Sequence, residues 1–582
     1  MKRSLKLCSH FPRIAGKRAC SQKQHILPDS TRSFATSLRR LYADVADTKD
    51  SRERVVILGS GWAGYVVARN LDAKKYKVTV ISPRTYFVFT PLLTDTAVGT
   101  LEFRNILESV RRANSDIEFV QGWADDVNFV AKTVDVEPSV LDPAQSYALI
   151  QSREGPAKEN MLIPEEEKQL DKSVHLENHV PVFPVKYDKL IVTVGSYSQT
   201  FNTPGVKENA YFLKDVGDAR KIRKRVLELF ELCHMPFISD ETKSQLLHFC
   251  VVGAGPTGME FAGNLSDLIQ QDMSRIHPQL MKFVKITLYD VAPKILPMFD
   301  AALADYASKQ YARHNISIKT SHHVEELRKG PPNMKDASQR QDQIPAGRAF
   351  TLRTTEDGET GCGMCVWSTG LMNNPFVAKA LSRVRRFPVE SAQVTEGSPI
   401  DQSNPRQWII QRNPKTGSII VDDHFRIQLQ TESASSEKSS ENAGHAIMQD
   451  AFAIGDCANI GGLTPPLPAT AQVANQQAQY LSSAFNKHYS SATSKFDHES
   501  YASSQGFNYH NRGVMTFLGS SKAVLQGPNT DRKGAGQGLK GFLAYAIWRG
   551  AYLTMTLSWR NKFLIPIQWL AVKLFGRHIS RF

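Results

Sequence analysis

The sequence predicts an α/β fold made of two parallel-sheet units, and three observations support this class. An apolar run at Val55–Leu58 predicts a buried parallel strand, and a glycine-rich turn follows it. The same order returns at Leu247–Glu260. Each turn is followed by a helical stretch and then by another apolar run, at Lys77–Ile81 and at Val284–Asp290. A strand, a helix and a strand repeated in this way predict two Rossmann-like units in one chain.

The first glycine-rich turn lies between the strand and a helix predicted at Tyr65–Leu71. Gly59, Gly61 and Gly64 have G-x-G-x-x-G spacing. The first glycine allows a tight turn, the second lets a pyrophosphate approach the main chain, and the third lets the helix pack closely on the strand. Free N–H groups at the helix N-terminus would bind the pyrophosphate. We expect a dinucleotide to contact Gly59, Ser60, Gly61, Trp62, Ala63 and Gly64.

The second turn repeats this spacing before a helix predicted at Met259–Leu268. We expect a second dinucleotide to contact Gly253, Gly255, Pro256, Thr257 and Gly258. Asp290 ends the second strand of this unit, where an acid hydrogen-bonds the adenosine ribose and repels a 2′-phosphate. This position favours NADH over NADPH. The alternative is an aspartate that only caps a turn.

The net charge of +14 is concentrated at the two ends of the chain. Met1–Ala43 holds ten Lys and Arg residues and one acid, and Arg532–Phe582 holds nine and no acid. The remaining body is therefore slightly acidic, so the charge does not indicate a nucleic-acid surface. Residues 1–42 are rich in Arg, Ser and Ala and predict a mitochondrial transit peptide. The alternative is a disordered basic tail.

The C-terminal region, residues 481–582, ends in an aromatic and basic segment, Leu539–Phe582. Its longest apolar run, Phe563–Val572, contains Pro566 and is too short to span a bilayer. Aromatic residues interleaved with cations predict amphipathic helices that lie in a membrane interface. A dimer contact or a buried helix pair is the alternative.

A charged helical stretch at Leu213–Leu232 predicts a surface helix.

Six segments together carry a resemblance to a known family. They are GSGWAG (59–64), ISPRTYFVFTPLL (81–93), VVGAGPTGMEFAG (251–263), VWSTG (366–370), FAIGDC (452–457) and LPATAQVANQQAQYL (467–481). In this order they resemble the type II NADH dehydrogenases, and within that family the fungal mitochondrial alternative enzymes. The family has a glutathione-reductase-like fold with two dinucleotide-binding domains. The resemblance runs from about Arg54 to the C-terminus and is interrupted only by insertions.

The resemblance implies non-covalent FAD in a discontinuous domain of residues 54–209 and 371–480, and NADH in a domain of residues 210–370. NADH would pass hydride to FAD, and two electrons would continue to ubiquinone without proton pumping. Ser82, Pro83 and Arg84 stand where the general rule expects an acid in the first unit, but this triplet is usual in the mitochondrial members. Further cofactor contacts implied by the resemblance are Thr90, Pro91, Thr369, Gly370, Gly455 and Asp456, the last on the ribityl chain.

Three positions, Glu260, Gln472 and Asn475, are implied to serve the reaction itself, and Ala471 is a further implied cofactor contact. Glu260 would face the nicotinamide, and its alternative is a solvated helix carboxylate. Ala471 and Gln472 belong to the quinone-side motif of the family, where the amide of Gln472 could donate to a quinone oxygen. Ordinary helix packing is the alternative for this stretch. Asn475 stands where several relatives carry histidine, which leaves a proton-donor role at this position open.

The predicted function is a respiratory NADH:ubiquinone reductase that associates peripherally with the mitochondrial inner membrane. The matrix side is favoured because Leu41–Arg54 contains no apolar stop-transfer stretch, and the family suggests a homodimer. A sulfide:quinone oxidoreductase and an NADH-sensing flavoprotein with little quinone turnover are the alternatives. No metal site is predicted.

A soluble disulfide reductase is a weaker alternative. Such an enzyme needs a cysteine pair soon after the first glycine turn, and no cysteine occurs between Cys20 and Cys233. Cys362 and Cys365 form C-x-x-C, but we expect them on one strand, where this spacing points their side chains to opposite faces.

Overall fold

The computed structural model describes residues 50–113, 116–140, 146–150, 182–332, 349–381, 383–384, 391–396, 408–431, 444–528 and 538–580. Residues 51–582 form one compact unit. The predicted transit peptide, residues 1–42, lies outside the described residues.

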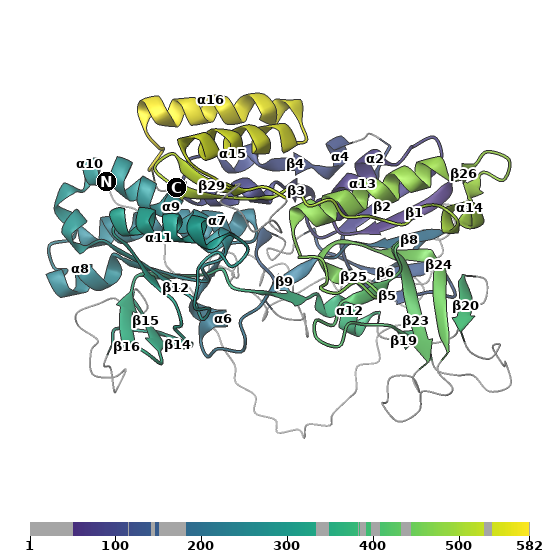
Figure 1. Ribbon diagram of the computed structural model, residues 1–582, viewed down its shortest axis with the longest axis horizontal. Coiled ribbons are helices and arrows are strands. Elements are labelled where there is room, and N and C mark those ends of the chain that lie inside the picture. Colours follow the sequence, from purple (N-terminus) through teal and green to yellow (C-terminus); the bar gives the residue numbers. More distant parts are fainter. Residues whose placement is uncertain are drawn as a thin grey trace, which may run out of the picture. The chain divides into compact units, whose positions relative to one another are not determined.

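The first parallel sheet has the strand order β5-β2-β1-β8-β24 (Figure 1). Its strands are β1 (Glu53–Leu58), β2 (Tyr76–Ser82), β5 (Glu118–Asn128), β8 (Lys189–Val192) and β24 (His445–Ala453). The four apolar residues from Val55 to Leu58 are at most 1% exposed, as expected for a central strand covered on both faces. The chain order reverses between β1 and β8, which pair in parallel. This switch point is where ligands bind in open α/β sheets.

Antiparallel strands extend both edges of this sheet. They are β6 (Thr133–Pro138) and β7 (Phe183–Lys186) beyond β5, and β19 (Arg383–Val384), β20 (Ala392–Glu396), β21 (Trp408–Ile410) and β23 (Arg426–Thr431) on the side of β24.

The second parallel sheet repeats the topology of the first, in the order β10-β17-β11-β12-β13. Its strands are β10 (Tyr211–Phe212), β11 (His248–Val252), β12 (Lys285–Tyr289), β13 (Ile316–Lys319) and β17 (Met364–Trp367). Here β11 corresponds to β1, and β17 corresponds to β8. A separate antiparallel sheet contains β14 (Val324–Lys329), β15 (Phe350–Thr354) and β16 (Gly358–Cys362). Two Rossmann-like units are therefore present, as the sequence predicts.

The glycine turns of the two units have matching close contacts. Gly59 has φ +112°, and a Cβ on it would lie 2.5 Å from the carbonyl oxygen of Thr193. A Cβ on Gly64, in α2 (Trp62–Asn70), would lie 2.0 Å from the oxygen of Gly59. In the second unit Gly253 has φ +108°, and a Cβ on Gly258, in α9 (Pro256–Leu268), would lie 1.9 Å from the oxygen of Gly253. No side chain fits at these positions.

Two further helices pack on helices of the first unit. α13 (Ala471–Lys487) packs along α2. α7 (Val216–Cys233) was expected on the surface, but Ile222, Val226 and Phe230 are fully buried. Even its Arg225 is 6% exposed, because the guanidinium donates to the carbonyl oxygen of Gly363 at 2.9 and 3.0 Å. The charges of this segment are thus partly internal, and the expectation of a surface helix is wrong.

The C-terminal region contains a small antiparallel sheet that the sequence did not predict, followed by two helices. These elements are β28 (Val514–Gly519), β29 (Lys522–Gln526), β30 (Gly538–Gly541), α15 (Phe542–Met555) and α16 (Trp559–Phe575). β28 packs on α9 so closely that a Cβ on Gly263 would lie 2.8 Å from backbone atoms of Leu518 and Gly519. This contact fixes the C-terminal region against the second glycine turn.

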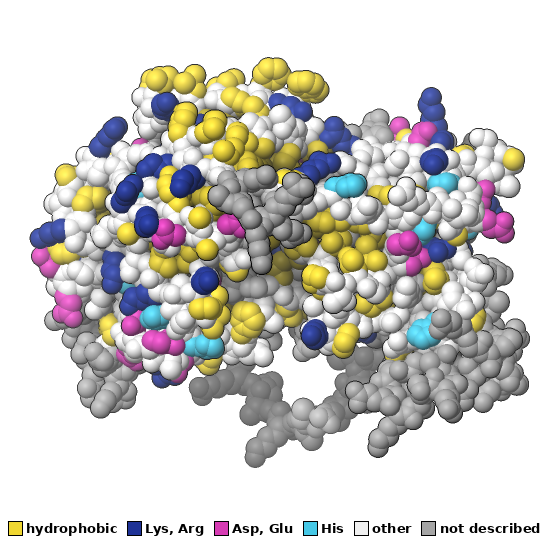
Figure 2. Space-filling view, in the orientation of Figure 1, with side chains coloured by type: hydrophobic (Ala, Val, Ile, Leu, Met, Phe, Trp, Pro, Cys, Tyr) yellow, Lys and Arg dark blue, Asp and Glu magenta, His cyan; other side chains and the backbone are white. Residues whose placement is uncertain are grey.

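α16 has apolar residues on both its inner and its outer face. Ile565 and Trp569 are buried, while Trp559, Phe563, Ile567, Leu570 and Leu574 are 57–75% exposed. These five residues recur every three or four positions and form one stripe, which we call the α16 stripe. Hydrophobic side chains gather over α15 and α16 in Figure 2. Among the described residues, no helix is long and apolar enough to cross a membrane.

The remaining helices and strands connect these layers. They are β3 (Tyr86–Val88), β4 (Leu107–Ser109), β9 (Ser196–Ser198), β18 (Leu371–Asn373), β22 (Ile419–Val421), β25 (Ala458–Ile460), β26 (Tyr489–Ser490), β27 (Lys495–Phe496), α3 (Leu93–Ala97), α4 (Val110–Ala113), α6 (Val206–Asn209), α8 (Asp240–Leu246), α10 (Ser274–Ile276), α11 (Ala301–Arg313), α12 (Pro375–Lys379) and α14 (His498–Ala502). Single helical turns occur at Thr90–Leu92, Phe103–Asn105, Ile269–Met273, Pro278–Phe283 and Gly455–Cys457.

Gly64→Ala should destabilise the fold, because the new methyl group would overlap the oxygen of Gly59. Overpacking of this kind costs on the order of 1–3 kcal/mol. Because the unfolding entropy of a chain of this size is about 1 kcal/mol/K, thermal unfolding should shift down by about 1–3 °C. Gly61→Ala is the matched control, since a Cβ there meets no heavy atom within 4 Å. Equal melting temperatures for the two variants in the absence of cofactor would contradict the assigned roles.

Candidate functional site

Two adjoining cavities lie at the carboxyl ends of β1 and β2. The first has a volume of about 840 Å³ and the second a volume of about 440 Å³. Both fall in the range of cavities that hold small ligands and cofactors. Five residues line both cavities and therefore mark their junction: Gly59, Arg84, Val194, Ser196 and Lys214.

Most of the predicted cofactor contacts line these cavities. The first cavity is lined by Gly59, Ser82, Pro83 and Arg84. The second is lined by Gly59, Ser60, Gly61, Trp62, Ala63, Arg84, Thr90, Pro91, Pro256, Thr257, Glu260, Thr369, Gly455, Asp456 and Ala471. The predicted residues that line neither cavity are Gly64, Gly253, Gly255, Gly258, Asp290, Gly370, Gln472 and Asn475. Met515 and Tyr552 also line the second cavity, so the C-terminal region contributes to the site.

The helices after the glycine turns begin without a side-chain cap. The N-caps of α2 and α9 are Gly61 and Gly255, whereas the N-cap of α13 is Thr470, whose hydroxyl accepts the N–H of Val473. A Cβ on Gly61 or Gly255 would meet no heavy atom within 4 Å. Open space beside uncapped N–H groups suits a pyrophosphate. The turn at Gly61 borders the second cavity, so the residues present fit FAD at the first unit.

The Ser-Pro-Arg triplet ties the first glycine turn to the end of β2. The Oγ atoms of Ser60 and Ser82 are 2.9 Å apart, and the Oγ of Ser60 donates to the carbonyl oxygen of Arg84 at 3.0 Å. The guanidinium of Arg84 forms an ion pair of 2.5 Å with Asp215, which is 1% exposed. The positive charge of Arg84 is therefore already balanced inside the first cavity.

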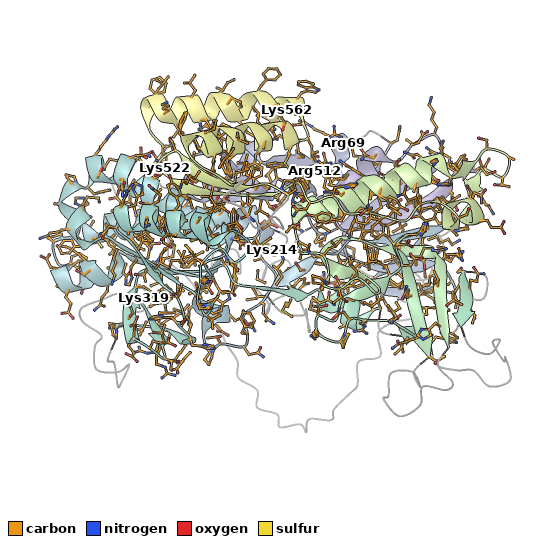
Figure 3. All side chains as sticks on the ribbon, in the orientation of Figure 1. Arg69, Lys214, Lys319, Arg512, Lys522 and Lys562 are labelled. Atoms are coloured by element: carbon orange, nitrogen blue, oxygen red, sulfur yellow. The ribbon has the colours of Figure 1, made fainter. Side chains whose placement is uncertain are left out.

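A lysine that sequence reasoning missed lies where the two cavities join. Lys214 is between the two sheets in Figure 3, and its Nζ donates to the backbone oxygen and, at 2.9 Å, to the Oγ of Ser196. The Oγ of Ser196 in turn donates to Asp456 at 2.8 Å. Burial lowers the pKa of Lys214 to about 8. Lys214, Ser196 and Asp456 thus form one hydrogen-bonded chain along the cavity wall.

Glu260 is a buried carboxyl group in the wall of the second cavity, with 7% of its surface exposed. Its Oε1 accepts the backbone N–H of Phe517 at 3.1 Å and the indole N–H of Trp548 at 3.3 Å. Burial raises the pKa of Glu260 to about 8, although these two donors favour the charged form. The carboxyl group can therefore hold or release a proton near neutral pH. Its alternative, a solvated helix carboxylate, is excluded by this burial.

Asp290 directly follows β12, as predicted, but both of its oxygens are used by the backbone. Oδ2 accepts the N–H of Ala254 at 2.5 Å, and Oδ1 accepts the N–H of Ala292 at 2.7 Å. The carboxylate thus holds the second glycine turn to the end of β12. Each oxygen retains a lone pair that a ribose hydroxyl could use.

Gln472 and Asn475 lie on α13, on the side of the C-terminal region. The amide oxygen of Gln472 accepts the hydroxyl of Tyr509 and, at 3.2 Å, the N–H of Arg512, and its amide nitrogen donates to Gly513 at 3.3 Å. The Oδ1 of Asn475 is buried without a hydrogen-bond partner among the described residues. Of the three predicted residues Ala471, Gln472 and Asn475, only Ala471 borders the second cavity.

None of the residues that line the two cavities is a cysteine. Cys362 ends β16, while Cys365 lies in β17, so the expectation that both occupy one strand is wrong. Gly363 separates the two strands, and a Cβ there would lie 1.9 Å from the oxygen of Leu246. Both thiols are buried in the second unit, and burial raises the pKa of Cys365. They do not form the redox pair that a disulfide reductase needs beside a flavin.

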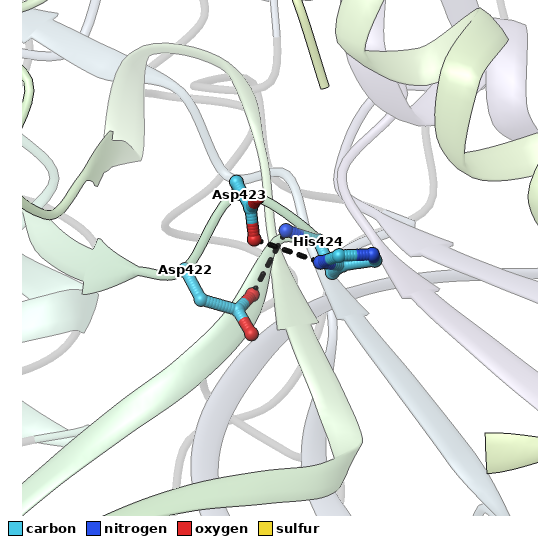
Figure 4. A group of neighbouring side chains, drawn as sticks. All are labelled: Asp422, Asp423 and His424. Atoms are coloured by element: carbon cyan, nitrogen blue, oxygen red, sulfur yellow. Dashed lines mark hydrogen bonds and ion pairs between the residues drawn. The ribbon is translucent and has the colours of Figure 1, made fainter. Parts of the chain in front are cut away.

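One cluster of potential metal ligands occurs among the described residues, formed by Asp422, Asp423 and His424 (Figure 4). Its groups are occupied by protein contacts. The Nδ1 of His424 is 2.7 Å from Asp423, and Asp422 forms an ion pair of 2.7 Å with Arg426. The cluster stabilises the turn after β22.

The comparisons with known proteins agree with this architecture. Residues 53–386 match the model for pyridine nucleotide-disulphide oxidoreductases, and residues 511–578 match the NDH2 C-terminal domain. A probable NADH dehydrogenase of Dictyostelium discoideum is 32% identical over 531 residues, covering 91% of each chain. The external NADH-ubiquinone oxidoreductase 2, mitochondrial, of Saccharomyces cerevisiae is 30% identical and covers 95% of this chain and 84% of its own length.

Among solved structures, NDH2 from Plasmodium falciparum in complex with NADH superposes with a TM-score of 0.65. It is 24% identical and covers 91% of this chain and all of its own, a likeness that supports the fold. The matched regions include both glycine turns, the cavities beside them and the C-terminal helices. The chain therefore belongs to the type II NADH dehydrogenase (NDH2) family of the pyridine nucleotide-disulphide oxidoreductases.

Proposed function

We propose that the protein is a non-proton-pumping NADH:ubiquinone oxidoreductase of the mitochondrial inner membrane that uses non-covalently bound FAD. One observation carries this proposal. The second cavity is lined by the glycine turn of the first unit, by Pro256 and Thr257 of the second unit, and by Met515 and Tyr552 of the C-terminal region. A cofactor, a nucleotide donor and an acceptor that arrives from the C-terminal side can therefore meet in one place.

FAD would be held by the turn at Gly59–Gly64, by the Ser82–Arg84 triplet, and by Thr90, Pro91, Thr369, Gly370 and Asp456. When bound, it accepts a hydride from NADH and passes two electrons onward. The chain positions it through the uncapped N-terminus of α2 and through the hydrogen-bonded chain of Lys214, Ser196 and Asp456. The residues of this domain are 54–209 and 371–480.

NADH would occupy the second unit, residues 210–370, with its pyrophosphate at Gly253–Gly258. The charge of Asp290 at the end of β12 opposes a 2′-phosphate, which supports a preference for NADH over NADPH. Glu260, one turn into α9, then lies at the cavity end of this nucleotide. Its carboxyl group holds a proton at the wall that the donor and the acceptor share.

Ubiquinone would approach from the C-terminal side, near Ala471 and Gln472 of α13. The second amide N–H of Gln472 is not used by its contact with Gly513 and remains a donor for a quinone oxygen. The buried Oδ1 of Asn475 can accept a hydrogen bond from a protonated quinone oxygen or from a water molecule.

The α16 stripe supports peripheral attachment to a membrane. The inner face of this helix is already buried in the protein. Exposed apolar side chains on its outer face therefore indicate a surface that inserts into a membrane interface. Residues 481–582 would thus make the membrane contact, and residues 1–42 would direct the protein to mitochondria. The enzyme would lie on the matrix side of the inner membrane. A homodimer is part of the same proposal.

Steady-state NADH oxidation by the FAD-loaded protein tests the reaction. We expect oxidation that depends on a short-chain ubiquinone and is slower with NADPH, because Asp290 opposes the extra phosphate. Flavin reduction by NADH without quinone turnover would support the NADH-sensing alternative. Turnover driven by sulfide instead of NADH would support the sulfide:quinone oxidoreductase alternative.

Trp548→Phe should move the ionisation of Glu260 to higher pH, because the charged carboxylate loses the indole N–H. One hydrogen bond to a charged group corresponds to a shift of about one pH unit in the pH profile of kcat. Glu260→Gln should remove this ionisation from the profile. Tyr545→Phe, on the same helix, is the matched control and should leave the profile unchanged. A profile that is the same for Trp548→Phe and the native protein would refute the role of this contact.

Phe563→Ser/Ile567→Ser should weaken binding to neutral phosphatidylcholine vesicles by at least about tenfold, because both side chains lose apolar burial in the lipid. Phe237→Ser/Val140→Ser, at residues that are 68% and 62% exposed elsewhere, is the control. These substitutions are preferable to deleting Leu539–Phe582, which would also remove the buried contacts of Trp548, Trp569 and Arg577. Equal binding of both double variants in vesicle sedimentation would rule out the stripe as the membrane contact.

A further inference from the structure

A separate cavity of about 530 Å³ lies at the turn between α15 and α16. Its walls come from four parts of the chain: α2, the start of β3, the segment around β4 and α4, and the start of α16. The side chains that matter here are Arg69, Arg104, Arg112, Arg560 and Glu108. We call this cavity the arginine pocket.

The arginine pocket carries an excess of positive charge. Four of the residues that line it are arginines and one is an acid. Glu108 is partly engaged, since its Oε1 accepts the amide of Asn561 at 2.8 Å. Arg69 donates to the backbone oxygen of Leu557 at 2.9 Å, and among the described residues none of the four guanidinium groups forms an ion pair. Four guanidinium groups and a single carboxylate around one cavity favour an anion with several oxygens.

The N-terminus of α16 adds to this field. Ser558 caps the helix by accepting the N–H of Asn561, and both Ser558 and Trp559 line the pocket. The partial positive charge of a 17-residue helix therefore points toward the same cavity. Phosphate oxygens are well matched to this combination of Arg forks and a helix N-terminus.

The pocket opens beside the apolar α16 stripe. Trp559 belongs to both features: it lines the pocket, and it is 75% exposed. The stripe continues from it along the outer face of α16. Figure 3 labels Arg69 and Lys562 at this end of α16. A ligand with a phosphate at one end and hydrocarbon chains at the other matches both surfaces at once.

We propose that the arginine pocket binds the phosphate headgroup of an anionic phospholipid whose acyl chains lie along the α16 stripe. The proposal rests on the membrane attachment proposed above and names its lipid partner. The ligand is a lipid phosphate and not a soluble phosphate compound, because the apolar α16 stripe begins at the rim of the pocket. The lipid would orient α16 by fixing its N-terminal end at headgroup level.

The test compares two double variants of the full-length, FAD-loaded protein. Arg104→Gln/Arg560→Gln removes two charges from the pocket, and both side chains are exposed. Lys540→Gln/Lys573→Gln removes two exposed charges of the C-terminal region outside the pocket. Binding is measured with vesicles of phosphatidylcholine alone and of phosphatidylcholine with phosphatidylglycerol. Turnover with a soluble short-chain quinone reports on the reaction independently.

With the mixed vesicles, we expect the pocket variant to bind about tenfold more weakly than the control variant. Both variants lose two positive charges and the same diffuse attraction to anionic lipid, but only the pocket variant also loses specific contacts with the phosphate. Binding to phosphatidylcholine vesicles and turnover with soluble quinone should be the same for both. Equal weakening of the two variants would overturn the proposal that the arginine pocket binds a lipid headgroup, and would leave the proposed membrane attachment in place. Binding of glycerol phosphate as tight as that of the vesicles would overturn the lipid assignment. A native protein that binds no vesicle would overturn both proposals.

Discussion

The architecture depends on two backbone contacts that only glycine permits. Helix α2 approaches the oxygen of Gly59 so closely that a methyl group on Gly64 would lie 2.0 Å from it, and α9 repeats this at Gly258 with 1.9 Å. Each contact holds a helix N-terminus at the carboxyl end of a central strand, beside a topological switch point. The orientation of the uncapped N–H groups, and therefore the position of anything bound there, follows from this packing.

The C-terminal region is the second determinant of the site, and it is joined to the two Rossmann-like units by buried polar contacts. Arg577 forms an ion pair of 2.6 Å with Asp272, and Asp95 accepts the indole N–H of Trp569 at 3.4 Å. Breaking a buried ion pair of this kind is costly, because the remaining charge stays without a partner. These contacts keep Trp548 beside Glu260, so α15 is part of the wall of the second cavity.

Local patterns predicted the two units because the glycine turns are set by steric rules within a few residues. β1, β2 and β12 differ from their predicted bounds by at most two residues at each end. Lys214, Trp548 and Tyr552 were missed because their partners lie far away in the sequence and no spacing reveals them. The burial of α7 was missed because the guanidinium of Arg225 donates to the carbonyl oxygen of Gly363, between β16 and β17. A charge pattern in the sequence cannot show this contact. The position of Asp290 at the end of the second strand was predicted, but its two backbone contacts were not.

The wall formed by Met515 and Tyr552 has a consequence for biogenesis. These residues belong to the last seventy of the chain, whereas the first glycine turn lies near its beginning. The complete cavity cannot form before this part of the chain has been synthesised and folded. A ligand of this cavity can therefore gain its full set of contacts only after the C-terminal region has folded, and a chain without Met515 and Tyr552 would leave this wall of the cavity open to water.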